Sequence, residues 1–275
     1  MIKIDNQVPM PSHTGQEKQK TIRATRLRSS DGFVLIPAEN EPERVYFGGS
    51  QTWMPVSNAS QGGCGTVAAA NLTAYMGLNR RGCEALYPYK DTKQSTYIQH
   101  MENVYRTVMP ISVTAVRRKL PPTVKRKVPV SLGIPGIKFF SNRVEKYAAC
   151  QGIKLEPVWG GIGDNPLNNS SLRLSLRQAT RYIRRGLKSD CPVILLNAWN
   201  PELRSITYFT NPTTGEVLTG SFQRHWITIT ALLEDEQQKS IMIEVSSWGC
   251  KVLLDLSNFW GKGFSSLLYF RERRE

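Results

Sequence analysis

The chain has 275 residues, 40% of them hydrophobic and 21% charged, which is typical of a globular protein that buries a substantial core. No apolar run approaches the roughly 18 residues that cross a bilayer, and the first 30 residues lack the apolar segment of a secretory signal, so we expect a cytoplasmic protein. The formal net charge of +14 favours anionic partners, whether nucleic acid, an acidic protein or a membrane surface.

Residues 1–30 are polar, rich in Lys and Arg and without a clear period, which predicts a mobile or extended lead. The segment Gly65–Met76 is helical in pattern and apolar almost all round, so we expect a helix buried at the centre of the fold. Further helices are expected at Gln94–Thr107 and Gly136–Gln151.

A fourth helix is expected to begin at Ser170 or Ser171 and to run to about Leu187. One face of it is apolar and comprises Leu172, Leu176, Ala179, Ile183 and Leu187. The neighbouring face is wholly basic and comprises Arg173, Arg177, Arg181, Arg184, Arg185 and Lys188. The pattern predicts a core-packed helix whose outer side is either solvated surface or the binding surface for an anionic partner.

From Pro192 onward short runs rich in β-formers follow one another. They read PVILLNAW, SITYFT, HWITITALL, SIMIEVS, KVLLDL and SSLLYF. Helices first and strands afterwards predict an α+β fold. We therefore expect a single domain over residues 31–275, with a helical half at about 31–189 and a β half at about 190–275.

The sequence QGGCGTVAAAN, residues 61–71, places Cys64 between glycines and directly before the central helix. A thiol at a helix N-terminus lies near the positive end of the helix dipole, which stabilises the nucleophilic thiolate. Gly62, Gly63 and Gly65 would let the backbone approach a substrate and direct the Cys64 N–H at an oxyanion. The alternative is a loop that ends in a buried, inert thiol.

The other four cysteines, Cys83, Cys150, Cys191 and Cys250, are expected to be ordinary free thiols. No pair of cysteines has the spacing of metal ligands, and no metal or organic cofactor is implied. A nucleophilic thiol needs a base, and the candidate is His225 at the head of HWITITAL, on the same strand face as Ile227 and Ile229. A histidine at the mouth of a sheet can reach a helix that packs across that sheet.

The motif VSSWG at 245–249 completes an order of Cys, His and a polar residue before Ser-Trp-Gly. In this order the chain resembles papain-like cysteine peptidases. It is most similar to bacterial members with Cys-Gly-x-x-Ala-Ala-Ala-Asn, relatives of the peptidases that remove double-glycine leaders. The resemblance covers segments near 47–76, 225–232 and 244–260. It implies a papain-like fold in which the nucleophile, on a central helix, packs against a C-terminal antiparallel sheet.

Two positions depart from the pattern of that family. The residue before Ser-Trp-Gly is normally Asn, whereas here it is Ser246, whose shorter side chain is then expected to orient His225. The glutamine of the oxyanion hole is expected to be Gln51, with Asn58 and then Gln61 as alternatives.

Two functions follow from these features. One is a cysteine peptidase or related acyl-transfer enzyme acting on peptides or proteins, with hydrolysis, deamidation and transpeptidation all open. The other is a papain-like scaffold without catalysis that binds an acidic protein or nucleic acid through its basic surface.

Overall fold

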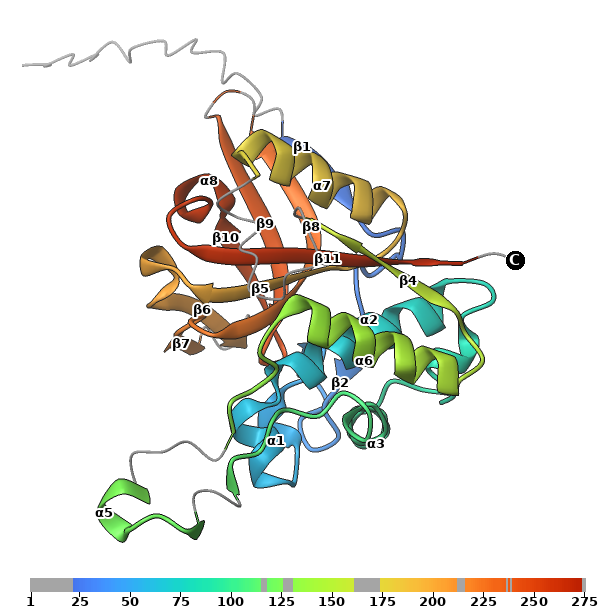
Figure 1. Cartoon of the computed structure of the whole chain (residues 1–275). Helices are drawn as coiled ribbons and strands as arrows, with labels where there is room; N and C mark the ends of the chain where they lie inside the picture. The colour runs from blue at the N-terminus through green and yellow to red at the C-terminus, as the bar shows by residue number, and fades with distance from the viewer. Residues whose placement is uncertain are drawn as a thin grey trace, which may run out of the picture.

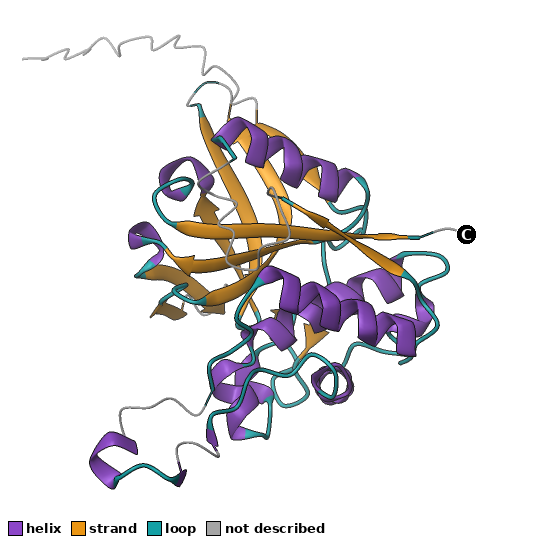
Figure 2. Ribbon diagram, viewed as in Figure 1, coloured by secondary structure: helices purple, strands orange, loops and turns teal. Residues whose placement is uncertain are grey.

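The computed structural model describes residues 22–114, 118–125, 131–160, 174–211, 216–235, 237 and 239–273. The fold is α+β, with one large antiparallel sheet and helices packed on both of its faces (Figures 1 and 2). Within these residues no helix is both long and apolar enough to cross a membrane.

The large sheet has seven strands in the order β10-β9-β8-β5-β11-β4, with β1 paired to β8. Its strands are β1 (Ile22–Arg26), β4 (Leu155–Trp159), β5 (Val193–Trp199), β8 (His225–Asp235), β9 (Ser240–Ser247), β10 (Cys250–Asp255) and β11 (Phe264–Glu272). Strand β8 is long enough that its first half pairs with β5 and its second half with β1. Two small hairpins pair β2 (Leu35–Pro37) with β3 (Val45–Phe47) and β6 (Ile206–Asn211) with β7 (Glu216–Gly220).

Helices lie on both faces of the large sheet (Figure 1). They are α1 (Ser57–Gly62), α2 (Cys64–Asn79), α3 (Gln94–Tyr105), α5 (Pro122–Lys125), α6 (Ile137–Cys150), α7 (Leu176–Lys188) and α8 (Leu256–Phe259), with short 3-10 turns η1 (Gln51–Trp53), η2 (Glu84–Leu86) and η4 (Pro201–Leu203). Helix α7 packs on Val193, which lies opposite Ile229 in the ladder. Helix α6 stacks Phe140 on Trp226, which points to the other face because side chains alternate along a strand.

The expected central helix is confirmed as α2, in which every residue from Cys64 to Gly77 is buried. Such a helix has no polar face to offer solvent, so it can only exist between other layers of the fold. The helices expected at Gln94–Thr107 and Gly136–Gln151 are α3 and α6. All six predicted C-terminal β-runs form strands.

Two strands of the large sheet come from parts of the chain where the sequence analysis placed none: the expected mobile or extended lead and the expected helical half. Residues 22–26 form β1, and 155–159 form β4, both in the large sheet. The sequence gives little sign of β1 because Thr25 is its one buried residue, and the strand is held by backbone pairing to β8. The rest of the expected lead, residues 1–21, lies outside the described residues.

The basic helix begins later than expected. Ser175 caps α7 in a reciprocal pair with Gln178, each side chain bonding the other's backbone N–H. Its apolar face is buried as predicted at Ala179, Ile183 and Leu187. Ser170, Ser171, Leu172 and Arg173 lie outside the described residues.

Candidate active site

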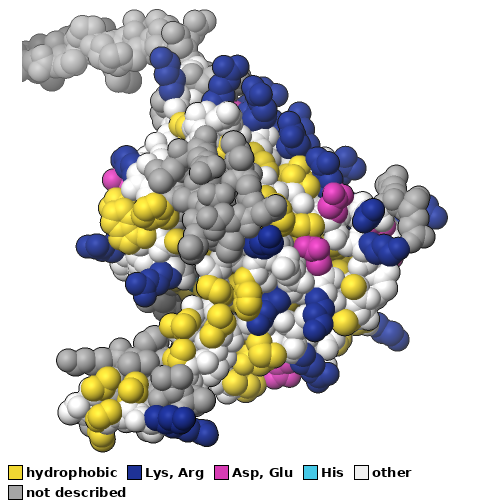
Figure 3. All heavy atoms as spheres, viewed as in Figure 1, with side chains coloured by type: hydrophobic (Ala, Val, Ile, Leu, Met, Phe, Trp, Pro, Cys, Tyr) yellow, Lys and Arg dark blue, Asp and Glu magenta, His cyan; other side chains and the backbone are white. Residues whose placement is uncertain are grey.

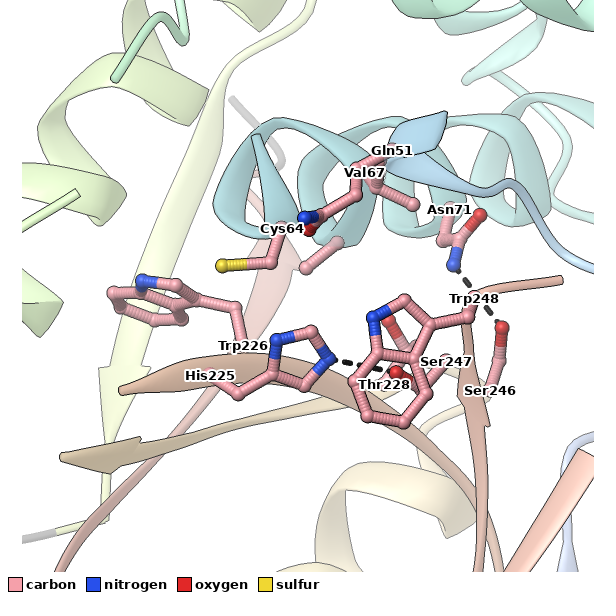
Figure 4. Close-up of a pocket in the computed structure, with 11 residues that line it drawn as sticks. Gln51, Cys64, Val67, Asn71, His225, Trp226, Thr228, Ser246, Ser247 and Trp248 are labelled. Carbon is pink, nitrogen blue, oxygen red and sulfur yellow. Dashed lines mark hydrogen bonds between the residues drawn. The ribbon is translucent and has the colours of Figure 1, made fainter. Parts of the chain in front are cut away.

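The structure brings Cys64 and His225 to one small cavity between α2 and the large sheet (Figure 4). Cys64 is the first residue of α2 and His225 is the first residue of β8. The imidazole Nδ1 is turned toward the side of the thiol (Figure 4). The space between the side chains is about 10 Å³, roughly the room that one water molecule needs. The lining residues are Gln51, Cys64, Val67, Ala68, Asn71, His225, Trp226, Thr228, Ser246, Ser247 and Trp248.

The glycines around Cys64 are required by packing within the protein. A β-carbon at Gly63 would lie 2.1 Å from the carbonyl oxygen of Ala59, where α1 runs into α2. A β-carbon at Gly65 would lie 2.7 Å from Cδ1 of Ile134. The glycines therefore let neighbouring segments close around the thiol, whereas the sequence suggested that they keep room for a substrate.

His225 is fixed by one hydrogen bond and by aromatic rings. Its Nε2 lies 2.7 Å from the hydroxyl of Ser247. The ring stacks on Trp248, with ring centres 4.6 Å apart, and on Phe222, with centres 5.4 Å apart. Asn197, opposite His225 on β5, supports this arrangement because its amide donates to the carbonyl of Phe222 at 2.6 Å. The imidazole is thus held at Nε2 and by ring stacking.

The expectation that Ser246 orients His225 is wrong by one residue. The Ser246 hydroxyl donates to the carbonyl of Phe47 at 2.7 Å and accepts from the amide of Asn71 at 3.1 Å. Ser246 pairs with Thr228 across the ladder, and its side chain points at α2. Because neighbouring side chains on a strand point to opposite faces, the next residue, Ser247, is the one that reaches His225.

Asn71 joins α2 to the segments around it. Besides donating to Ser246, it accepts from the backbone N–H of Gly49 at 2.8 Å and from the hydroxyl of Tyr97 at 2.7 Å. A β-carbon at Gly48 would lie 2.4 Å from the Ser246 oxygen, so this junction is tightly packed. Asn71 is the last residue of the QGGCGTVAAAN motif around Cys64, and no role for it was predicted from the sequence.

Among the three oxyanion candidates, Gln51 alone lines the cavity. Its Nε2 donates to the carbonyl of Ser60 at 3.0 Å, and its Oε1 is buried without a hydrogen-bond partner. Asn58 instead donates toward the hydroxyl of Tyr105 at 3.4 Å beside a separate cavity, and Gln61 is exposed. The geometry therefore favours Gln51.

Burial sets the protonation of the pair. It raises the pKa of the Cys64 thiol, an effect that backbone hydrogen bonds to Trp226 and Gly65 offset only in part. It lowers the pKa of His225 to about 3. Both groups are therefore neutral at pH 7, which contradicts the thiolate expected from the start of a helix.

Three further residues at the cavity escaped the sequence analysis: Ser247, Trp226 and Thr228. The indole N–H of Trp226 donates to the carbonyl of Ile134 at 3.0 Å, while the Thr228 hydroxyl is buried without a partner. All five cysteines are free. In the described part of the chain no group of three or more His, Cys, Asp or Glu side chains is arranged to hold a metal ion.

The chain was compared with known proteins. No protein-family model matches it, and no curated protein matches it. Among solved structures it is similar to the crystal structure of UfSP from C. elegans, with a TM-score of 0.46 and 8% sequence identity. The match covers 94% of this chain and 36% of the other, so the chain spans about a third of that protein's length. A likeness at this level decides neither the fold family nor the activity.

Proposed function

We propose that the chain is a cysteine peptidase of papain-like arrangement, with Cys64 as nucleophile and His225 as base. The observation that carries the proposal is the meeting of these two residues in one cavity, with Nδ1 of the imidazole turned toward the thiol (Figure 4). The order of motifs along the chain supports it independently. Membership of the bacterial branch related to double-glycine leader peptidases is part of the proposal and depends on the motif around Cys64 alone.

The neutral state of the pair fixes the sequence of proton transfers. We assign the ring proton to Nε2 of His225, which then donates to the Ser247 hydroxyl 2.7 Å away, and this leaves the lone pair of Nδ1 for the thiol proton. As the Cys64 sulfur attacks the substrate carbonyl carbon, its proton moves to Nδ1. The imidazolium then gives this proton to the leaving amine as the C–N bond breaks. Water hydrolyses the resulting thioester and regenerates the thiol.

Charge on the substrate oxygen needs donors in the same cavity. Gln51 supplies one, because only one of the two N–H groups on its Nε2 is needed for the bond to Ser60. The backbone N–H of Cys64 is the second donor that we assign. The unpartnered Oε1 of Gln51 would accept a hydrogen bond from the N–H of the bound peptide.

The proposal is tested by trapping the acyl-enzyme. Incubation with activated peptide esters, followed by peptide mass mapping, should find the acyl group on Cys64 and a burst of leaving group equal to the enzyme present. Cys64→Ala and His225→Ala should abolish the adduct, whereas Cys150→Ala, which removes an exposed thiol, should not. Acylation of Cys150 alone, or a burst that survives Cys64→Ala, would overturn the assignment.

A second function is a scaffold of the same arrangement that binds an anionic partner without turnover. Two observations favour it: the neutral thiol in a cavity with room for one water, and the exposed basic side of α7 (Figure 3). An unreactive Cys64 together with binding that weakens steeply with salt would select this alternative.

A further inference from the structure

A second cavity lies beside α7 and shares no lining residue with the thiol cavity. Its volume is about 230 Å³, and it is lined by Trp159, Gly160, Leu174, Gln178, Arg181, Tyr182 and Arg185. Trp159 ends β4 and Gly160 follows it, Leu174 precedes α7, and the other four residues lie in the first three turns of α7. None of them belongs to the peptidase mechanism proposed above.

The polar groups of this cavity are hydrogen-bond donors. Arg181 and Arg185 are one helical turn apart, both are exposed, and neither forms an ion pair with any residue that the structure describes. Gln178 uses its Oε1 to accept from the backbone of Ser175, so its N–H groups are the part left for a ligand. Among the described residues that line the cavity there is no carboxylate. Such a donor set matches an oxyanion.

Trp159 adds an aromatic surface to the cavity. It lines the same cavity as the two arginines and is half-buried. Its indole Nε1 is enclosed and has no hydrogen-bond partner among the residues that the structure describes. Trp159 therefore contributes its ring, and not its N–H, to the cavity.

The cavity is held open by packing around it. The hydroxyl of Tyr182 donates to the carbonyl of Val158, and its ring packs against Tyr269 with centres 5.1 Å apart. A β-carbon at Gly160 would lie 2.8 Å from Leu267 and 3.0 Å from Tyr182, so the chain leaves β4 in close contact with this wall. Contacts within the fold therefore fix the wall of the cavity that Tyr182 and Gly160 form.

Charge continues along α7 beyond the cavity. In Figure 3 a row of Lys and Arg side chains follows the edge where Figure 1 places α7 and β1. On α7, Arg177 and Lys188 are exposed as well, whereas Arg184 is already paired with Glu234. A single carboxylate would contact only the cavity, whereas a chain of phosphates would also contact the row of Lys and Arg side chains.

We propose that this cavity binds a phosphate group of a nucleotide or of a single-stranded nucleic acid. Arg181 and Arg185 hold the phosphate oxygens, and the half-buried rings of Trp159 and Tyr182 offer surfaces for stacking a base. The site is independent of the proposed peptidase and would remain if the peptidase assignment failed.

The test measures binding of a fluorescein-labelled single-stranded RNA to the full chain by fluorescence anisotropy. Arg181→Gln/Arg185→Gln should weaken binding about 100-fold, since two charge-assisted hydrogen bonds are lost. Lys90→Gln/Lys119→Gln removes the same charge from exposed lysines on other segments and should change binding by no more than about twofold. Trp159→Ala removes one stacking surface and should weaken binding about tenfold.

Competitors identify the source of the phosphate. Displacement by ATP and by inorganic phosphate supports a nucleotide site, and displacement by RNA alone supports a site for the nucleic acid backbone. Equal weakening by the α7 and control double variants would overturn the proposal, because it would mean diffuse attraction to the net charge. Equal displacement by an acidic peptide such as polyglutamate would also overturn it.

Discussion

Adjacent serines at the end of β9 have different tasks, and alanine at each position separates them. Ser246→Ala removes a hydroxyl that bonds the carbonyl of Phe47 and the amide of Asn71, both within the buried junction around α2. Ser247→Ala removes only the group that bonds Nε2 of His225. The first change should therefore act on stability and the second on the chemistry of the site.

The magnitudes follow from the number of groups left without a partner. Each buried polar group that loses its hydrogen bond costs about 1–3 kcal/mol. Ser246→Ala leaves two such groups and should lower the free energy of unfolding by about 2–5 kcal/mol, or the melting temperature by about 5–10 °C for a chain of this size. Ser247→Ala leaves one group, so about half of that loss is expected.

Calorimetry gives the stability, and the rate of acylation of Cys64, measured well below the melting temperature, gives the chemistry. Ser247→Ala should slow acylation about tenfold, the equivalent of about 1.4 kcal/mol in orienting His225. Ser246→Ala should leave the rate per folded molecule within about twofold. Ser247→Thr keeps the hydroxyl and should restore most of the rate. If Ser246→Ala slows acylation while the melting temperature stays unchanged, the sequence-based assignment of Ser246 is right and the structural one is wrong.

Three further predictions concern residues around the site. Gly63→Ala should lower the free energy of unfolding by about 2–3 kcal/mol in chemical denaturation, because the new β-carbon meets the backbone of Ala59. Gly65→Ala should lower it by less than about 1 kcal/mol, because the new β-carbon meets the movable end of the Ile134 side chain. Equal losses for the two variants would contradict this. Thr228→Val should raise the free energy of unfolding by about 1 kcal/mol by removing an unpaired buried hydroxyl; a loss of acylation instead would show that this oxygen serves the reaction. Burial lowers the pKa of His100 to about 4. The neutral imidazole therefore contributes fully to the free energy of unfolding above pH 6.5, and this contribution is lost as the pH falls toward 4. His100→Gln should remove about 3 kcal/mol of that acid sensitivity in denaturant titrations at pH 7 and pH 4, and unchanged acid sensitivity would count against a neutral buried imidazole.

Much of the architecture could be predicted because the core elements have strong local patterns. The central helix is apolar on all sides, and the C-terminal strands are separated by clear turns. Strand β1 was missed because four of its five residues are exposed, and its place depends on pairing with Ala231–Asp235 some two hundred residues away. Backbone pairing at that distance has no local hydrophobic signal.

The residues of the candidate site could be predicted only in part, because the sequence shows the order of motifs but not the register of the strands. The order of motifs along the chain was enough to single out Cys64 and His225. It was not enough to choose between Ser246 and Ser247, because that choice depends on which face of β9 meets α2. The face is set by the register that places Ser246 opposite Thr228, and a shift of one residue would exchange the two serines.

The protonation of the site is where the sequence argument failed most clearly, and the reason bears on the mechanism. A helix N-terminus stabilises an anion by about 0.3–2 kcal/mol, whereas full burial can shift a pKa by several units, so burial prevails at Cys64. Under the proposed mechanism charge then exists only during the reaction, when the proton is on His225. The imidazolium formed at that moment lies on the ring of Trp248, an arrangement that stabilises a cation, and donates to Ser247. In the proposed mechanism Trp248 and Ser247 thus stabilise the imidazolium of His225. In the papain-like peptidases that the sequence resembles, an asparagine would contribute to this stabilisation.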